Sequence, residues 1–191
     1  KIKVPTHDYF LRPEKLVRYM KSRINMDNVS QNIISVFKKP SLLLFIKNFS
    51  QKKNNHLNFQ VRQTRNLKKI FKLINFLNKK KMNIVILGNK KDHFIKSITN
   101  LKKNQNWKNV FLFKDLSSNY SINDQVYVAY KSKGYIGSAS GGNVFSVLLM
   151  KNILLIDCPY YYVDKYWKRV KCLYKKIYNI KKKKSEVFYW Q

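Results

Sequence analysis

The sequence predicts an α/β fold: a Rossmann-like parallel sheet of about five strands with helices on both faces. Three observations support this prediction. Short apolar runs of strand length alternate with segments whose apolar residues recur every three or four positions. The short runs are apolar throughout, as in strands that are buried on both faces. Polar and small residues follow these runs directly, where parallel sheets of this kind bind their ligands.

The first 40 residues are mixed in character. A helix is predicted from Pro13, because proline is favoured in the first turn of a helix. The segment 32–37 fits either a second short helix or a short strand. We assign 1–40 to a partial N-terminal segment or linker, and 41–191 to a Rossmann-like domain with a C-terminal helix.

Nine elements alternate from residue 41 onward. Each helical segment has one apolar face, and each intervening run is short enough for a buried strand. Strands joined through helices run parallel, with right-handed crossovers. The predicted elements are strand 41–46, helix 66–80, strand 83–87, helix 92–103, strand 109–113, helix 122–132, strand 134–137, helix 142–150 and strand 153–156.

The segment after Pro159 is aromatic and basic. Its apolar residues fall near helical spacing from Val163 to Ile177. This spacing predicts a helix that packs back on the sheet. The alternative is a basic aromatic helix that lies on an anionic membrane.

The small-residue turn at 137–142 is the most informative stretch. Four of the chain's five glycines lie between 134 and 142. Small residues at a strand-to-helix turn let a ligand approach the backbone, and the helix N-terminus offers unpaired N–H groups to an anion. A tight turn packed against a neighbouring element is the plain alternative. The position of the turn at a strand end favours an anion or nucleotide site.

The charge of the chain identifies no partner by itself. The formal net charge is +31, but the basic residues are 34 Lys against 6 Arg. Proteins that read nucleic acid usually favour Arg for its planar fork, and high Lys, Asn and Ile with 2 Ala is typical of an AT-rich genome. Nucleic acid is therefore an unlikely partner, whereas sugar nucleotides and anionic lipid headgroups remain open.

Several classes of protein are disfavoured by the motifs that the sequence lacks. There is no dinucleotide fingerprint after the first predicted strand, no phosphate-binding P-loop motif and no G-x-S-x-G nucleophile elbow. Two cysteines and three scattered histidines fit neither a disulfide framework nor a metal motif. No apolar run is long enough to span a membrane. We expect a cytoplasmic protein without metal or cofactor, either free or peripheral to the inner membrane. The start at Lys1 suggests a piece of a longer chain.

Cations near the strand ends would suit a diphosphate. Lys47 ends the first predicted strand, and Arg62 and Arg65 precede the helix 66–80. Cations and a helix N-terminus can stabilise a departing nucleoside diphosphate without a metal ion. Each arginine either contacts the ligand or points to solvent, and Asn66 either contacts the ligand or caps the helix.

Four segments carry a resemblance to a known family. SLLLFIKN, TRNLKKIFKLINFLNKKKMNIVILGN, GYIGSASGG and MKNILLIDCP, in this order, resemble bacterial glycosyltransferases of GT-B type from surface-polysaccharide loci. The resemblance covers roughly residues 40–185 and is to the C-terminal, donor-binding half. It implies a metal-independent enzyme that transfers a sugar from a nucleotide-sugar donor to a glycan or lipid-linked acceptor. The family has a histidine-x-arginine-like strand end where this chain has Phe45, Ile46 and Lys47.

The resemblance and the strand ends together give the candidate site residues, and no catalytic residue is among them. The predicted donor-diphosphate residues are Lys47, Arg65, Asn66, Ser138, Ser140, Gly141, Gly142 and Asn143. The predicted nucleotide-binding residues are Gly88, Asn89 and Asp115. Two further hypotheses stay open: a non-catalytic RNA- or ribosome-associated protein, and a non-catalytic protein of a glycan locus with a degenerate site.

Overall fold

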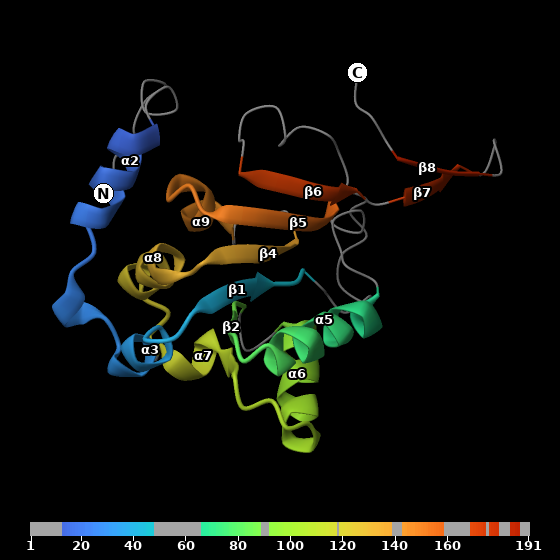
Figure 1. Cartoon of the computed structure of the whole chain (residues 1–191), viewed down its shortest axis with the longest axis horizontal. Helices are drawn as coiled ribbons and strands as arrows, with labels where there is room; N and C mark the ends of the chain where they lie inside the picture. Colours follow the sequence, from blue (N-terminus) through green and yellow to red (C-terminus); the bar gives the residue numbers. More distant parts are fainter. Residues whose placement is uncertain are drawn as a thin grey trace.

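The computed structural model describes residues 13–47, 66–88, 92–117, 119–138, 143–158, 169–174, 176–179 and 184–187. Its centre is a six-stranded, all-parallel sheet in the order β3-β2-β1-β4-β5-β6, with helices on both faces (Figure 1). The predicted fold class is therefore confirmed, with one strand more than expected. The strands are β1 (Ser41–Phe45), β2 (Asn83–Ile86), β3 (Val110–Leu112), β4 (Gly134–Ser138), β5 (Asn152–Cys158) and β6 (Val170–Tyr174).

The first strand lies at the centre of the sheet. β1 pairs with β2 on one side and with β4 on the other, so that Leu43 is in register with both Val85 and Tyr135. The chain builds outward from β1 to β3, then returns to add β4, β5 and β6 on the opposite side. The strand order therefore reverses between β1 and β4, and this switch point is where open α/β sheets bind ligands.

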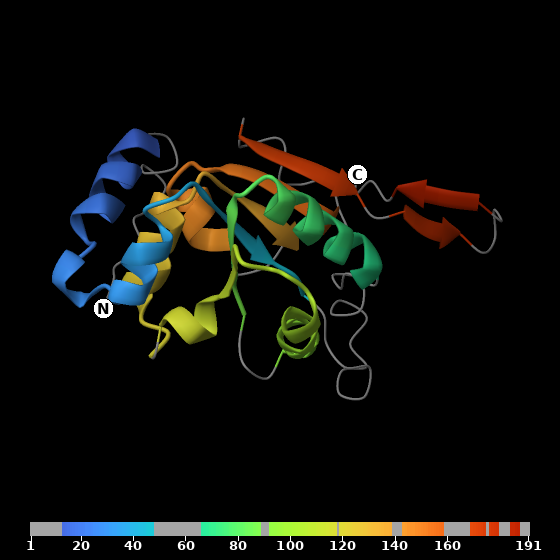
Figure 2. The same cartoon turned by 60° about the horizontal axis from the view of Figure 1, so that its bottom comes forward.

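Two groups of helices cover the two faces of the sheet. α2 (Pro13–Ser22), α3 (Gln31–Val36), α8 (Ile122–Lys131) and α9 (Val144–Leu148) lie on one face, and α5 (Leu67–Lys79) and α6 (His93–Asn104) lie on the other (Figures 1 and 2). A 3-10 turn, η1 (Met26–Asn28), joins α2 to α3, and the short helix α7 (Phe113–Leu116) follows β3.

The alternation of side chains along each strand divides the buried residues into two cores. In β1, Leu43 packs on the face of α8 and α9, whereas Leu44 packs on the face of α5 and α6. Val85 and Ile86 of β2 divide between the faces in the same way. This explains why the central parts of β1 and β2 are apolar on both sides, since both faces of the sheet are covered there.

The segment before β1 packs on the same core. The prediction left 32–37 open between helix and strand, and the structure places 32–36 in α3, with Phe37 as the residue that caps its end. Ile33 is fully buried in the core of the α8 face, and Asn83 Nδ2 donates to the carbonyl oxygen of Val36 at 2.7 Å. α3 is thus joined to the start of β2. A domain boundary at residue 40 stays a prediction.

A buried carboxylate fixes the start of α8. Asp124 is 5% exposed and accepts hydrogen bonds from Ser117 Oγ at 2.6 Å and from the Ser30 N–H at 3.1 Å. Its own N–H donates to Ser121 Oγ, which caps the helix. One carboxylate thereby connects the segments around α3, α7 and α8, and it places α8 over the sheet.

The helix predicted after residue 163 is wrong over the described part of that segment. Val170–Tyr174 forms β6, which pairs with β5 in parallel, and Lys176–Asn179 (β7) pairs antiparallel with Lys184–Val187 (β8). Within β6, buried Val170 alternates with exposed Lys171 and Leu173, the pattern of an edge strand. The spacing of the apolar residues in this segment fits the two-residue period of a strand as well as the period of a helix. Over the same described residues, the membrane-bound helix and the C-terminal helix of the predicted domain are overturned as well.

The helix predicted at 142–150 is shorter in the structure. α9 comprises Val144–Leu148, and Asn143 precedes it without a side-chain cap hydrogen bond. The dipole of so short a helix contributes little at its N-terminus. Any anion site at this position therefore depends on the backbone of the turn rather than on the helix.

Candidate functional site

β1 and β4 approach each other closely at the carboxyl edge of the sheet. Gly137 is in register with Phe45, and a Cβ atom at Gly137 would lie 2.0 Å from the Phe45 carbonyl oxygen. Any side chain here would force the two strands apart. Glycine is therefore required at the switch point for packing, independently of any ligand.

Two predicted donor-binding residues meet across this junction. The N–H of Lys47 donates to Ser138 Oγ at 2.9 Å, which joins the ends of β1 and β4. Ser138 is 1% exposed, and its carbonyl oxygen accepts a hydrogen bond from Tyr135 Oη at 3.2 Å. Burial raises the pKa of Tyr135, so that this hydroxyl stays protonated as a donor. Ser138 thus positions the strand end, and its role toward a ligand stays a prediction.

Gly88 begins the turn after β2. Its φ of +140° is a conformation that L side chains rarely adopt, and a Cβ atom there would lie 2.8 Å from Asp92 Oδ2. This backbone brings the chain from β2 toward the start of α6 at the carboxyl edge. Gly88 also lines a pocket at this edge, where a nucleotide-binding role was expected for it.

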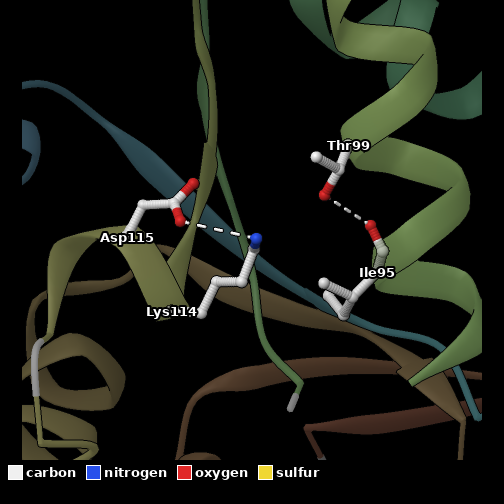
Figure 3. A network of polar contacts seen from close by, with 4 residues as sticks. All are labelled: Ile95, Thr99, Lys114 and Asp115. Atoms are coloured by element: carbon white, nitrogen blue, oxygen red, sulfur yellow. Dashed lines mark hydrogen bonds and ion pairs between the residues drawn. The ribbon is translucent and has the colours of Figure 1, made fainter. Parts of the chain in front are cut away.

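Asp115 lies on α7, directly beyond β3. Its carboxylate is more than half exposed and lies 3.6 Å from Lys114 Nζ (Figure 3). Figure 3 also shows Thr99 of α6, whose hydroxyl donates to the Ile95 carbonyl oxygen within its own helix at 2.8 Å. An exposed ion pair of this kind adds little stability, so Asp115 keeps its carboxylate accessible at the predicted nucleotide-binding end of the sheet.

Asn66 caps α5. Its side-chain oxygen accepts a hydrogen bond from the Lys69 N–H at 3.2 Å, the standard contact of an N-cap asparagine. The capping alternative for this residue is thus confirmed, and a further contact with a ligand stays a prediction. Five other predicted site residues, with Arg62, lie outside the described residues: Arg65, Asn89, Ser140, Gly141 and Gly142.

An apolar pocket opens beside this group of strand ends. It has a volume of about 200 Å³ and lies between the sheet and the helices α8 and α9. Phe45, Phe113, Tyr120 and Phe145 supply aromatic rings to its wall, and the rings of Phe113 and Tyr120 meet edge to face at 5.8 Å. The remaining lining residues are Leu43, Leu87, Gly88, Gln125, Val128, Ala129 and Ser146.

Ser146 of α9 brings a buried hydroxyl group to the pocket wall. Ser146 is 1% exposed, and its Oγ makes no hydrogen bond to any of the described residues. A buried hydroxyl without a partner is unfavourable by about 1–3 kcal/mol, so such groups usually have a water or ligand partner when the site is occupied. Ser146 therefore marks this pocket as a place where a small molecule with a polar atom would be stabilised.

The sequence did not identify the pocket residues, apart from Gly88. Phe45 and Phe113 stand at strand ends, and this position was a usable signal for them. Ala129, Phe145 and Ser146 reach the pocket only through the way α8 and α9 lie on the sheet, and their apolar spacing indicated core packing alone.

The described residues contain no group of three or more His, Cys, Asp or Glu side chains able to hold a metal ion. Among the same residues, no helix is long and apolar enough to cross a membrane.

Comparisons with known proteins find structural but not sequence similarity. No protein-family model matches the chain, and no curated protein matches it in sequence. Among solved structures, Escherichia coli ADP-heptose LPS heptosyltransferase II matches with a TM-score of 0.53 and 12% identity, over 84% of this chain and 43% of that one. E. coli heptosyltransferase WaaC with ADP-2-deoxy-2-fluoro heptose matches with a TM-score of 0.48 and 12% identity, over 82% and 40%. A UDP-GlcNAc 2-epimerase from Methanocaldococcus jannaschii gives a TM-score of 0.44 and 11% identity, over 73% and 36%.

The likeness to heptosyltransferase II concerns the fold, because the identity is low. This chain spans less than half the length of that protein. Its six parallel strands and flanking helices correspond to one Rossmann-like half. The chain therefore has the α/β fold of about half of a GT-B heptosyltransferase.

Proposed function

We propose that this chain is the donor-binding part of a metal-independent glycosyltransferase that uses a nucleotide-sugar donor. The observation that carries the proposal is the pocket at the carboxyl ends of β1, β2 and β3, lined by Phe45, Phe113 and Phe145 and containing the hydroxyl of Ser146, which has no partner among the described residues. Aromatic walls with one polar group suit the planar base of a nucleotide. The fold likeness to a heptosyltransferase agrees with this function.

The predicted division of roles follows the positions of the residues. The base would occupy the apolar pocket beside Gly88, and the diphosphate would lie over the ends of β1 and β4, near Lys47 and the turn after Ser138. Lysine would hold a phosphate as a point charge, and backbone N–H groups of the turn would add hydrogen bonds. Both would stabilise the charge that develops on the departing nucleoside diphosphate.

The acceptor chemistry has to come from elsewhere in the protein. The family resemblance implies a glycan or lipid-linked acceptor in surface-polysaccharide synthesis, at the cytoplasmic side of the membrane. A catalytic base is not among the residues assigned at this edge. We therefore assign the chain donor binding and leaving-group stabilisation, and we assign acceptor activation to the part of the enzyme that faces the carboxyl edge.

The test is the melting temperature with ADP, GDP, UDP and CDP. At least one nucleoside diphosphate should raise it, and Ala129→Leu should abolish the increase, because Ala129 lines the pocket and is 2% exposed. Leucine would fill part of the roughly 200 Å³ cavity without removing a charge. Arg65→Ala should also abolish the increase if the predicted diphosphate contact exists.

Val144→Leu is the matched control, because Val144 is 46% exposed on α9 and does not line the pocket. It should retain the full increase. No increase with any of the four nucleotides would contradict the proposal. An increase that Ala129→Leu leaves intact would place the nucleotide outside the pocket.

A further inference from the structure

A second group of charged side chains lies at the opposite, amino edge of the sheet. Five cations converge there from separate segments of the chain. Lys21 comes from the last turn of α2, which stands at the end of the sheet where β4 and β5 begin (Figures 1 and 2). The other four are Lys131 at the end of α8, Lys133 before β4, Lys151 before β5 and Arg169 before β6. We call these five residues the amino-edge cluster.

Tyr130 lies at the centre of the amino-edge cluster. The ammonium groups of Lys21, Lys131 and Lys151 lie 5.2, 5.6 and 5.6 Å from the centre of its ring. The distance between any two of these ammonium groups is therefore at most the sum of their two distances from the ring centre. This geometry places three positive charges close together although they come from three different segments, with the aromatic face holding them there.

Two members of the cluster are held by backbone carbonyl groups. Lys151 Nζ donates to the carbonyl oxygen of Tyr130, in the last turn of α8, where helical carbonyls lack partners. Arg169 Nη1 donates to the carbonyl oxygen of Met150 at 2.9 Å. These contacts hold the half-buried Lys151 and the guanidinium in place beside the other lysines, before any ligand is bound.

No acidic side chain balances these charges within the described residues. The ion pair found there, Lys114–Asp115, lies at the carboxyl edge. The pKa of Lys151 is lowered first by burial and then by the neighbouring charges of Lys21, Lys133, Arg169 and Lys131. The protein thus keeps together like charges that repel each other, and a bound anion would relieve that repulsion.

We propose that the amino-edge cluster binds the phosphate groups of an anionic ligand. A phosphate offers compact, multiple negative charge and several acceptor oxygens, which suits converging ammonium donors and the guanidinium fork of Arg169. Two sources have this chemistry: phospholipid headgroups at a membrane surface, and a free phosphate or diphosphate compound. The site lies across the sheet from the proposed donor site and does not depend on it.

The experiment compares two triple variants with the same change in charge. Lys21→Gln/Lys131→Gln/Lys133→Gln removes three exposed lysines of the cluster. Lys79→Gln/Lys80→Gln/Lys81→Gln is the control, because these exposed lysines are consecutive in sequence and lie outside the cluster. Binding is measured to phosphatidylcholine vesicles with and without phosphatidylglycerol, and to inorganic pyrophosphate.

We expect the cluster variant to bind at least one of the two ligands about a hundredfold more weakly, and the control variant to lose less than about threefold. Loss with vesicles alone would assign the phosphate to lipid headgroups, and loss with pyrophosphate alone would assign it to a free phosphate compound. Equal loss in both variants would overturn the proposal in favour of general charge attraction. Cluster-dependent binding of single-stranded RNA that is tighter than binding of either phosphate ligand would also overturn it.

A second measurement needs no substitution, so it remains decisive if the triple variant does not fold. The reactivity of Lys151 toward an amine-acylating reagent is followed by mass spectrometry. Pyrophosphate or phosphatidylglycerol vesicles should protect Lys151 at least fivefold, and should leave Lys79 and Lys80 unchanged. Absence of protection by either ligand would overturn the proposal. Ala129→Leu should leave this protection intact, so failure of the nucleotide site can be told apart from failure of this one.

Discussion

The two edges of one sheet are built from different chemistry. At the carboxyl edge, aromatic side chains enclose a pocket of about 200 Å³, and polar atoms such as Ser138 Oγ are held by backbone groups. At the amino edge, three lysines gather around Tyr130, and Arg169 binds the nearby Met150 carbonyl oxygen, without an acidic partner in the described residues. On our proposals, shape would select a ligand at the first edge, whereas charge would select one at the second.

This difference follows from how a parallel sheet is built. Each crossover between parallel strands returns the chain to the amino edge, so residues that precede strands collect there, as Lys133, Lys151 and Arg169 do. Turns that leave the strands collect at the carboxyl edge, where close backbone approach is needed. A chain with 34 lysines places many of them before strands by composition alone, but convergence on one tyrosine depends on the fold.

The largest expected effect is on the free energy of unfolding, and it compares how closely the backbone packs at the two edges. Gly137→Ala should lower the free energy of unfolding by about 3 kcal/mol, and Gly134→Ala by about 1 kcal/mol. A Cβ atom at Gly137 would lie 2.0 Å from a backbone oxygen at the carboxyl edge, against 2.7 Å at Gly134 near the amino edge. Both substitutions reduce the freedom of the unfolded chain similarly, so urea unfolding of the pair isolates the clash. Equal losses would mean that the carboxyl edge is no tighter than the amino edge.

An intermediate effect concerns the polar group of the pocket. Ser146→Ala should raise the free energy of unfolding of the ligand-free protein by about 1 kcal/mol, because it removes a buried hydroxyl without a partner. The control is Ser97→Ala on α6, where the exposed hydroxyl donates to the His93 carbonyl oxygen at 3.1 Å. It should change stability by less than about 0.5 kcal/mol. A destabilised Ser146→Ala variant would indicate that the hydroxyl already has a partner.

The strands were predictable because burial on both faces leaves a clear signal in the sequence. Runs such as 84–87 are apolar at every position, and the structure uses both of their faces, Val85 on one side and Ile86 on the other. The end of the chain was not predictable in this way. Val170 begins an edge strand whose apolar residues fit two periods, and pairing with β5 decides between them.

The candidate sites also differ in how far their residues could be predicted from the sequence. Lys47 and Ser138 were identified from the sequence because strand ends meet at one edge, and the structure joins them by a hydrogen bond. Ser146 and the amino-edge cluster were not identified, because their members come together through the packing of α2, α8 and α9 on the sheet. Contacts of this kind are tertiary and have no fixed spacing in the sequence.

The smallest expected effect tests the charge of the amino edge through its pH dependence. Since the native pKa of Lys151 is below its ordinary value of 10.5, the charged form is disfavoured in the folded state. As pH rises through the native pKa, the folded protein releases this proton while the unfolded chain keeps it, so stability rises. Above about pH 10 the buried Tyr127 and Tyr135 act in the opposite direction, because burial raises their pKa values and their ionisation favours unfolding.

The difference between wild type and Lys151→Gln isolates the lysine, because both proteins share the tyrosines. Relative to the variant, the wild-type protein should gain stability as the pH of chemical denaturation experiments is raised from 7 to 10 at low salt. The same comparison with Lys80→Gln, an exposed lysine outside the cluster, should give a constant difference. If the free energy of unfolding of Lys151→Gln and of wild type changed with pH in parallel, the charges at the amino edge would repel too weakly to affect stability. The proposed contrast between the two edges would then lack its electrostatic part.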